Sequence, residues 1–204
     1  MEIRLGGPTG PIIAEFTPAH TSGWANYITA YIGLLDGDSL TGVHDLTFVG
    51  KRNVWSFSLA YFELSDFADR TVVNTLIEGT EISTNFGVRF DEAKVVEWFD
   101  AGDFVTYSQV NFGAPGTAKG LSLRYSKDTD DGKSNMEVRL GGPTGQLLGE
   151  FAPIRTISWA DFVDACVELD AEEVDGIHDL TFVGKGDISI LNLESFSITE
   201  SCPP

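Results

Sequence analysis

The sequence predicts an all-β protein that folds as an antiparallel β-sandwich or barrel. Apolar and polar residues alternate with the two-residue period of β-strands along residues 67–200. Gly, Pro, Asn and Asp separate the alternating runs, and the chain holds 22 glycines, which favours many tight turns. Short strands and turns at regular spacing are typical of sandwiches and barrels.

A second observation is an internal repeat. Residues 1–16, MEIRLGGPTGPIIAEF, recur as residues 136–151, MEVRLGGPTGQLLGEF, and residues 42–51 recur as 176–185. The offset is 136 − 1 = 135 residues at first and 176 − 42 = 134 residues later. A period of this length is that of a whole domain. The early copy matches only the back half of the later one, so it is expected to be an incomplete second copy.

Each predicted strand shows its own alternation. In residues 121–125 and again in residues 136–140, every second side chain is apolar. The Gly-Gly-Pro-Thr-Gly run at 141–145 predicts a turn, because glycine adopts positive φ and proline fixes its own φ. Residues 180–183 continue the pattern with Leu and Phe on one face.

The last strand contains a shift in phase. The apolar alternation that begins at Leu191 continues on the opposite register from Phe196. One extra residue near Glu194, a β-bulge, restores a common apolar face. Residues 57–64 show the same shift, which predicts a second bulge near Ala60.

The composition excludes some partners. The formal net charge is −18, from 31 acidic and 13 basic residues, so nucleic acid and anionic membranes would repel the chain. No apolar stretch is long enough to span a bilayer, and Glu2 and Arg4 interrupt any signal-peptide pattern. Cys166 and Cys202 are compatible with one disulfide or with two unrelated thiols.

An ordered set of segments resembles the family 6 carbohydrate-binding modules, which are jelly-roll appendages of polysaccharide-degrading enzymes. The segments are IEGTE at 77–81, EWFDAGDFVTYSQVNFG at 97–113, LRY at 123–125, MEVRLGGPTG at 136–145, the loop around Trp159, GIHDLTFVG at 176–184 and LNLESF at 191–196. The resemblance implies a jelly-roll β-sandwich that binds oligosaccharide without catalysis. Residues 1–64 resemble only the second half of such a module.

The resemblance also implies a binding site at the loop edge between the two sheets, with the concave face of a sheet as the alternative. Trp98 takes the position of the family's tyrosine, Trp159 that of its loop tryptophan, and Asn192 that of its asparagine. Indole rings offer flat apolar platforms for the C–H faces of a pyranose, and an amide both donates to and accepts from hydroxyls. Without the resemblance, packing in the core is the commoner role of tryptophan in a sandwich. Trp24 is the counterpart of Trp159 in the first copy, where Ser58 replaces the asparagine.

A structural calcium near the opening acidic strand is a further implication of the resemblance. Its expected ligands are Glu81, Glu78 and Glu194, although the opening motif carries an apparent insertion relative to the family. Residues 128–132 contain three aspartates but lack the spacing of a calcium-binding loop, which favours an acidic hairpin tip.

His44 and His178 occupy equivalent places in the repeat, and an aspartate follows each. A histidine–aspartate pair is compatible with catalysis or metal binding. No serine or cysteine nucleophile pattern accompanies either histidine, so a structural turn is the favoured interpretation.

The expected organisation is a partial module at 1–64, a linker at 65–74 and a complete module at 75–200. Half a jelly roll exposes unpaired strand edges, which predicts that the natural chain is longer, with Met1 internal to a tandem pair attached to a catalytic domain. The resemblance implies an extracellular location.

The predicted function is binding of a neutral β-linked polysaccharide, which targets an attached enzyme to its substrate. Two alternatives remain open. A glycoside hydrolase needs a pair of carboxylates, which 31 acidic residues could supply. A calcium-dependent adhesion or matrix domain would use the same sandwich for protein contacts.

Overall fold

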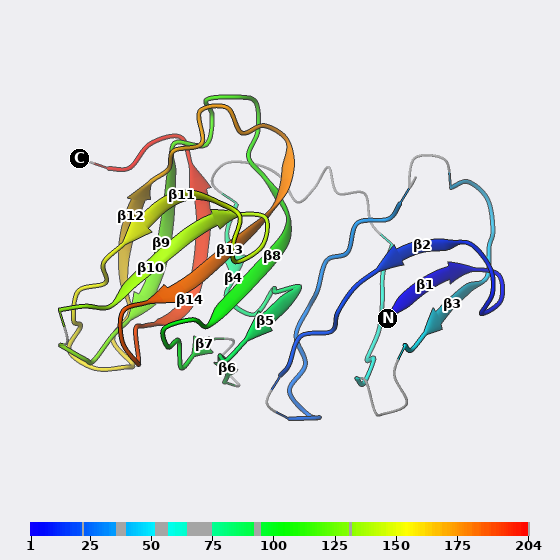
Figure 1. The fold of residues 1–204 in the computed structure, drawn as a ribbon, viewed down its shortest axis with the longest axis horizontal. Helices are drawn as coiled ribbons and strands as arrows, with labels where there is room; N and C mark the ends of the chain where they lie inside the picture. Colours follow the sequence, from blue (N-terminus) through cyan, green and yellow to red (C-terminus); the bar gives the residue numbers. More distant parts are fainter. Residues whose placement is uncertain are drawn as a thin grey trace.

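The computed structural model describes residues 1–21, 23–35, 40–51, 57–64, 75–91, 95–130 and 132–203. The segment 65–74, predicted to be a linker, and Asp131 of the acidic run lie outside these residues. Within them the fold is all-β, and the prediction of an antiparallel sandwich is confirmed (Figure 1). The fourteen strands are β1 (Glu2–Leu5), β2 (Ile12–Glu15), β3 (Leu46–Val49), β4 (Ile77–Glu78), β5 (Thr84–Phe86), β6 (Arg89–Phe90), β7 (Val96–Glu97), β8 (Phe104–Asn111), β9 (Gly120–Ser126), β10 (Asn135–Leu140), β11 (Gln146–Phe151), β12 (Val163–Glu168), β13 (Ile177–Lys185) and β14 (Asn192–Thr199).

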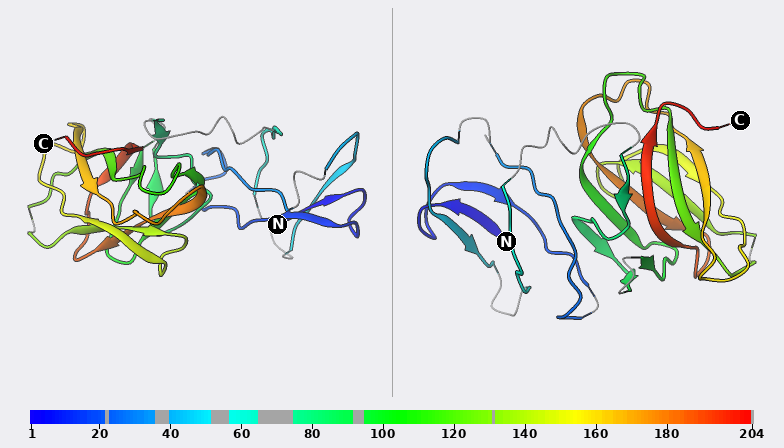
Figure 2. Two further views of the ribbon diagram at one scale, coloured as in Figure 1. Left: turned by 90° about the horizontal axis from the view of Figure 1, so that it is seen from above. Right: turned by 180° about the vertical axis from the view of Figure 1, so that it is seen from behind.

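Two sheets form the complete copy. One has the order β11-β10-β13-β8-β5 and the other the order β12-β9-β14-β7-β6, with β4 paired to β14. The views in Figure 2 show the two sheets stacked as a sandwich beside the smaller N-terminal part. Because each sheet contains strands from both halves of the module, neither half supplies a whole sheet.

Aromatic rings fill the space between the sheets. Tyr107 of β8 contacts Phe182 of β13 and Phe196 of β14 edge-to-face, with ring centroids 5.7 and 4.7 Å apart. Phe182 and Phe196 also contact each other at 5.1 Å. All three side chains are essentially fully buried. This geometry is the one that aromatic rings prefer, so the cluster joins the two sheets.

The hairpin of β10 and β11 repeats the hairpin of β1 and β2. Both turns require a glycine, since a Cβ on Gly145 or on Gly10 would lie 1.8 Å from the carbonyl oxygen of Leu140 or Leu5. The predicted bulge near Glu194 is confirmed, because the pairing of β14 with β9 shifts register between Leu193 and Ser195.

A buried carboxylate lies beside each hairpin. Arg139 donates to Glu137 at 2.7 Å, and Lys185 lies 3.2 Å from the same carboxylate. In the first copy Arg4 and Lys51 contact Glu2 in the same way. The hydrogen bond from Arg139 holds the pKa of the Glu137 carboxyl below its ordinary value, and burial opposes this effect.

Replacing Glu137 with glutamine is therefore expected to lower the free energy of unfolding by about 2 kcal/mol at neutral pH. The stability that the lowered pKa provides is present above the usual carboxyl pKa and is lost as the pH falls through the lowered value. Urea unfolding across pH 2–7 should show the difference between variant and parent shrinking in acid. Glu200→Gln, at an exposed position, is the control, and a difference independent of pH would contradict the expectation.

Cys166 and Cys202 form a disulfide, which decides between the two alternatives that the sequence left open. Cys166 lies on the edge strand β12 and Cys202 lies beyond the end of β14. A Cβ on Gly120 of β9 would lie 3.1 Å from the Cys202 sulfur. The bridge thus crosses the strand that lies between its two partners.

The first copy keeps only part of this architecture. β1, β2 and β3 form a three-stranded sheet in the order β2-β1-β3. Residues 57–64 form no strand, so the bulge predicted near Ala60 is wrong. The copy contacts the complete module at Asn85 of β5, whose side-chain amide bonds both the N–H and the carbonyl of His20, at 2.8 and 3.0 Å.

The two repeated histidines occupy equivalent turns. The ring nitrogen Nε2 of His178 lies 2.6 Å from the carbonyl oxygen of Asp175, and that of His44 lies 2.7 Å from the carbonyl oxygen of Thr41. Each ring therefore closes a local turn, which is the structural role that the sequence favoured for both histidines.

Candidate ligand-binding site

The three predicted site residues of the complete copy converge at one end of the sandwich. β14 lies between β9 and β7 in its sheet, and Asn192 is the first residue of β14. Trp98 directly follows β7 on one side. Trp159 lies in the loop between β11 and β12, which is bonded to the end of β9 on the other side. Asn192 therefore has an indole-bearing segment on each flank.

The Trp98 side chain is open to solvent, with 54% of the residue exposed. Its φ is 61°, in the left-handed region that bulky residues rarely adopt. The guanidinium carbon of Arg89 lies 4.8 Å from the ring centroid, so a cation–π contact accompanies one face of the ring. Such backbone strain tends to gather at functional sites.

Two hydrogen bonds hold the segment that follows Trp98. The Ile190 N–H donates to the Phe99 carbonyl at 2.7 Å, and the Ser189 N–H donates to the Asp100 carboxylate at 2.7 Å. The turn that precedes β14 is thereby joined to the Trp98 segment. These bonds fix the position of the ring relative to Asn192.

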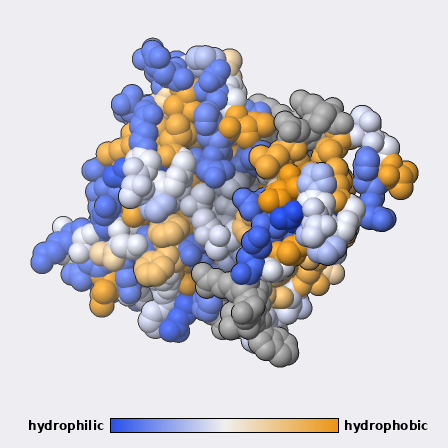
Figure 3. Space-filling view, turned by 45° about the vertical axis from the view of Figure 1, so that its right-hand side comes forward, coloured by the Kyte–Doolittle hydropathy of each residue, from blue (hydrophilic) through white to orange (hydrophobic). Residues whose placement is uncertain are grey.

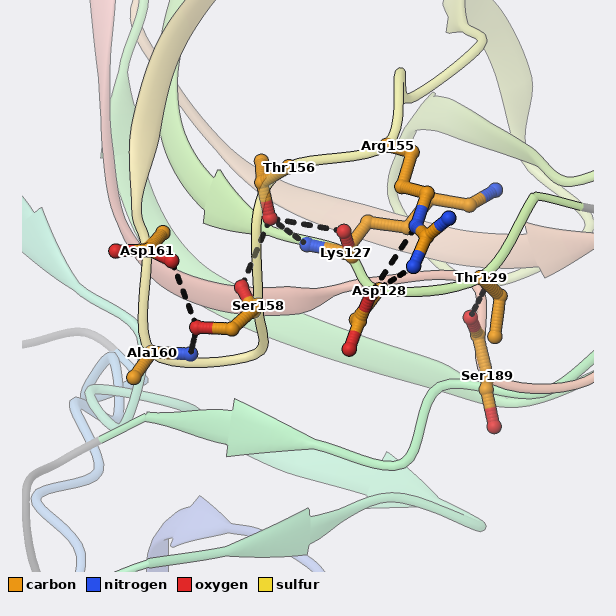
Figure 4. Close-up of polar contacts among 9 residues, drawn as sticks. All are labelled: Lys127, Asp128, Thr129, Arg155, Thr156, Ser158, Ala160, Asp161 and Ser189. Atoms are coloured by element: carbon orange, nitrogen blue, oxygen red, sulfur yellow. Dashed lines mark hydrogen bonds and ion pairs between the residues drawn. The ribbon is translucent and has the colours of Figure 1, made fainter.

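Figure 4 shows how the loop that carries Trp159 is fastened. Thr156 and Lys127 exchange three hydrogen bonds, of 2.7 to 3.0 Å, through the Thr156 hydroxyl and both backbones. Ser158 donates to the Asp161 carboxylate at 2.7 Å, and Arg155 donates to Asp128 at 2.8 Å. A pre-formed loop loses less entropy on binding a ligand.

Ser126 connects this loop to the asparagine. It is the register partner of Asn192 across β9 and β14, and its hydroxyl donates to the Trp159 carbonyl at 2.7 Å. Trp159 itself is partly buried. Ser126 and Arg89 were not predictable from the sequence, because no motif marks them and their roles depend on contacts between loops.

The Asn192 side chain is the distinctive polar group of the site. Only 8% of the residue is exposed. Among the described residues its amide makes no hydrogen bond, and its polar atoms are not fully buried without a partner, so they face solvent at the site. An amide that faces solvent is satisfied by water in the free protein and is available to a ligand. A ligand with hydroxyl groups would supply both a donor and an acceptor.

Two acidic groups near the site hold their protons more tightly than usual. Burial, followed by the nearby charge of Asp91, raises the pKa of Glu97. Burial likewise raises the pKa of Asp103, which accepts a hydrogen bond from the Asp100 N–H at 3.0 Å. Glu97 is the register partner of Arg89 across β6 and β7. The three predicted site residues themselves are an amide and two indoles, which suits an uncharged ligand.

The fold brings the predicted calcium segments together, since Ser195 pairs with Glu78 and the Gly79 N–H donates to the Glu194 carbonyl at 2.6 Å. However, the Glu194 carboxylate binds Arg124 at 2.6 Å. Within the described ranges no group of three or more His, Cys, Asp or Glu side chains could hold a metal ion. The arrangement of Glu81, Glu78 and Glu194 therefore does not fit a carboxylate cage, and calcium stays a prediction.

Trp24 is separate from the other predicted site residues. It is 60% exposed and lines a cavity formed by residues 3–64. Ser58, which replaces the asparagine in the first copy, is also exposed. A sugar-binding role for Trp24 stays a prediction.

These features define a β-sandwich with two indole-bearing segments on either side of an amide at one end of its sheets, and comparison with known proteins identifies the family. The family model described as "Carbohydrate binding module (family 6)" matches residues 1–66 and 77–200. The chain belongs to this family, whose model matches it in two segments. It is a carbohydrate-binding module.

Relatives of known sequence and structure agree. The chain is 27% identical over 203 residues to an endo-1,4-beta-xylanase A of Thermoclostridium stercorarium, with 93% of this chain and 29% of that protein covered. A family 6 module of Clostridium cellulolyticum, solved with xylose, is 28% identical over 61% of this chain and 96% of its own, with a TM-score of 0.54. A beta-1,3-glucan-binding module of Bacillus halodurans, 24% identical over 61% of this chain and 95% of its own with a TM-score of 0.53, shares the fold.

The chain spans less than two fifths of the length of the xylanases that it matches, at 29% and 37%. Across the described part of the chain, the fold contains no helix able to traverse a bilayer.

Proposed function

We propose that residues 75–200 bind a neutral β-linked polysaccharide or oligosaccharide in the slot between Trp98 and Trp159, with Asn192 beneath it. The observation that carries the proposal is the Asn192 amide, which is largely buried and without a protein partner between two indole-bearing loops. Binding requires no ionised group and no reacting residue. The module would hold an attached enzyme close to its substrate.

In the proposed site, the two indoles and the amide have different roles in sugar recognition. Each indole removes the C–H groups of a sugar face from water, which is favourable in proportion to the apolar area covered. The amide fixes the orientation of the ring through its hydroxyls. Because Arg89 contacts one face of the Trp98 ring, we infer that the sugar covers the opposite face.

Calorimetry tests the proposal. It measures the affinity of the full chain for soluble oligosaccharides of xylan, cellulose and β-1,3-glucan. We expect Trp98→Ala and Trp159→Ala each to weaken binding about 30-fold, because each removes roughly 2 kcal/mol of apolar contact. Asn192→Ala should weaken binding about 10-fold, since it deletes hydrogen bonds made in a sheltered site.

Ile157→Ala is the matched control, because Ile157 is 88% exposed in the same loop as Trp159. Its affinity should equal that of the parent. Binding that survives all three site substitutions would place the sugar elsewhere and overturn the proposal. Unfolding curves must first show that each variant is folded.

We further propose that the chain has no hydrolytic activity of its own. Incubation with the oligosaccharide that binds should leave it intact. Release of reducing ends that is abolished by Glu97→Gln would instead support a glycoside hydrolase, since the raised pKa of Glu97 suits a general acid.

The proposed setting is extracellular, within a longer chain that carries a catalytic domain. The disulfide between Cys166 and Cys202 supports an oxidising compartment. The match to part of two longer xylanases supports the attachment. Tandem copies of a module raise avidity by keeping a second site at high local concentration.

Calcium binding is proposed from the family resemblance alone. If Glu81, Glu78 and Glu194 hold calcium, the melting temperature of the full chain should be higher in millimolar calcium than in a chelator, by mass action on the folded state. Glu81→Gln should remove that difference. Equal melting temperatures in calcium and in the chelator would exclude a structural site.

A further inference from the structure

The first half of the complete copy, residues 77–126, and its second half, from Met136 onward, contribute differently to the two sheets. In one sheet, β11, β10 and β13 are neighbours, and all three come from the second half. In the other sheet, β12 and β14 also come from the second half, but β9 from the first half lies between them. The second half alone can therefore build three strands of one sheet and none of the other.

The first copy shows this outcome. Its strands β1, β2 and β3 are the counterparts of β10, β11 and β13, and they pair in the same order. Residues 28–33 and 58–64 are the counterparts of β12 and β14, with offsets of 135 and 134, and neither range forms a strand. What these two segments lack is a strand equivalent to β9.

In the described structure, apolar side chains of the first copy also lie in water. Leu59, Phe62 and Leu64 are 50%, 53% and 65% exposed, whereas their counterparts Leu193, Phe196 and Ile198 are at most 3% exposed. A cavity of about 920 Å³ opens among residues 3–64. Figure 3 shows apolar side chains gathered on this part of the surface. An uncovered apolar patch of this kind marks an interaction site.

The residues that remain are already arranged for a partner. Phe48 and Phe62 contact each other with ring centroids 5.3 Å apart, and their counterparts Phe182 and Phe196 lie 5.1 Å apart. In the complete copy Tyr107 contacts both rings of the pair. The first copy thus preserves two members of the aromatic cluster, and among the described residues no ring takes the place of Tyr107.

The backbone offers a matching edge. β13 pairs with β10 on one side and with β8 on the other. Its counterpart β3 pairs with β1, and within the described ranges nothing pairs with its other edge. An exposed edge of this kind accepts an added strand through main-chain hydrogen bonds.

We propose that this face, formed by residues 1–64, is a docking surface for a polypeptide segment with the strand pattern of residues 77–126, which is the first half of a family 6 module. A strand like β8 adds to the free edge of β3 and places an aromatic ring against Phe48 and Phe62. A strand like β9 pairs with residues 28–33 on one side and 58–64 on the other. This proposal does not depend on sugar binding by the complete copy.

The complete copy itself supplies the probe. Residue 135 leads directly into Met136, the counterpart of Met1. Placing a second copy of residues 75–135 immediately before Met1 of the full chain therefore reproduces the chain order of the complete module. Hydrogen exchange, dye binding to apolar surface, and light scattering are measured on the fused and unfused chains.

We expect fusion to slow the exchange of amides in residues 28–33 and 58–64 by on the order of 100-fold, as new strands form. Dye binding should fall, and the fused chain should be monomeric. Phe62→Asp in the fused chain should restore fast exchange, because it places a charge against the donated ring. Ile188→Asp, at an exposed position of the complete module, is the control.

Two results would overturn the proposal. Fast exchange in both segments of the fused chain would show that a first half does not fit this face. Slow exchange in an unfused chain that scatters as a dimer, reversed by Phe62→Asp, would assign the face to a second copy of the same surface.

Discussion

Replacing Tyr107 with alanine is expected to lower the free energy of unfolding of the complete module by about 4 kcal/mol, which is a large part of the stability of a domain. Tyr107 is fully buried and contacts Phe182 and Phe196, so truncation empties a volume that rigid rings surround. Rings of this kind cannot collapse into the space without leaving their preferred geometry. Urea unfolding of the full chain, followed by tryptophan fluorescence, measures the loss.

Tyr107→Phe separates packing from hydrogen bonding. The Tyr107 hydroxyl donates to the Gly79 carbonyl at 2.7 Å, so the phenylalanine variant keeps the ring contacts and leaves that carbonyl without this donor. A loss of about 1 to 2 kcal/mol is expected. If the alanine variant lost no more than the phenylalanine variant, the aromatic cluster would not be what holds the sheets together.

Removing the disulfide is expected to cost about 4 kcal/mol. The bridge closes a loop with a sequence separation of 36 residues, and the chain-entropy treatment of the unfolded state gives roughly that value. It also joins the edge strand β12 to the segment after β14, across β9. The variant Cys166→Ser, Cys202→Ser should therefore unfold at a lower urea concentration than the parent.

The double variant is preferable to a single one, because one remaining thiol would form bridges between chains. The parent treated with a reductant should unfold at the same urea concentration as the double variant. If the parent is equally stable with and without reductant, the two cysteines do not form a bridge that matters for stability.

Local alternation predicted the strands well where a partner strand exists. The runs at 121–125, 136–140 and 180–183 lie within β9, β10 and β13. The bulge near Glu194 was predicted because a phase shift in a strand is a property of the sequence itself. The same shift near Ala60 gave a wrong prediction, because a strand forms only where a neighbour satisfies its backbone.

The candidate site was predictable only in part, for related reasons. The positions of Trp98, Trp159 and Asn192 follow from the order of the motifs, and the fold brings them to one end of the sandwich. The contributions of Ser126 and Arg89 depend on distances between loops. The pairing of Cys166 with Cys202 likewise depends on tertiary structure, since both residues lie far apart in the sequence.

The left-handed backbone at Trp98 links recognition to robustness. A glycine adopts this conformation without steric penalty, whereas a tryptophan there costs on the order of 1 to 3 kcal/mol. Selection for heat resistance alone would favour loss of the indole at this position. The indole on which the proposed sugar site depends is thus kept at a standing thermodynamic disadvantage.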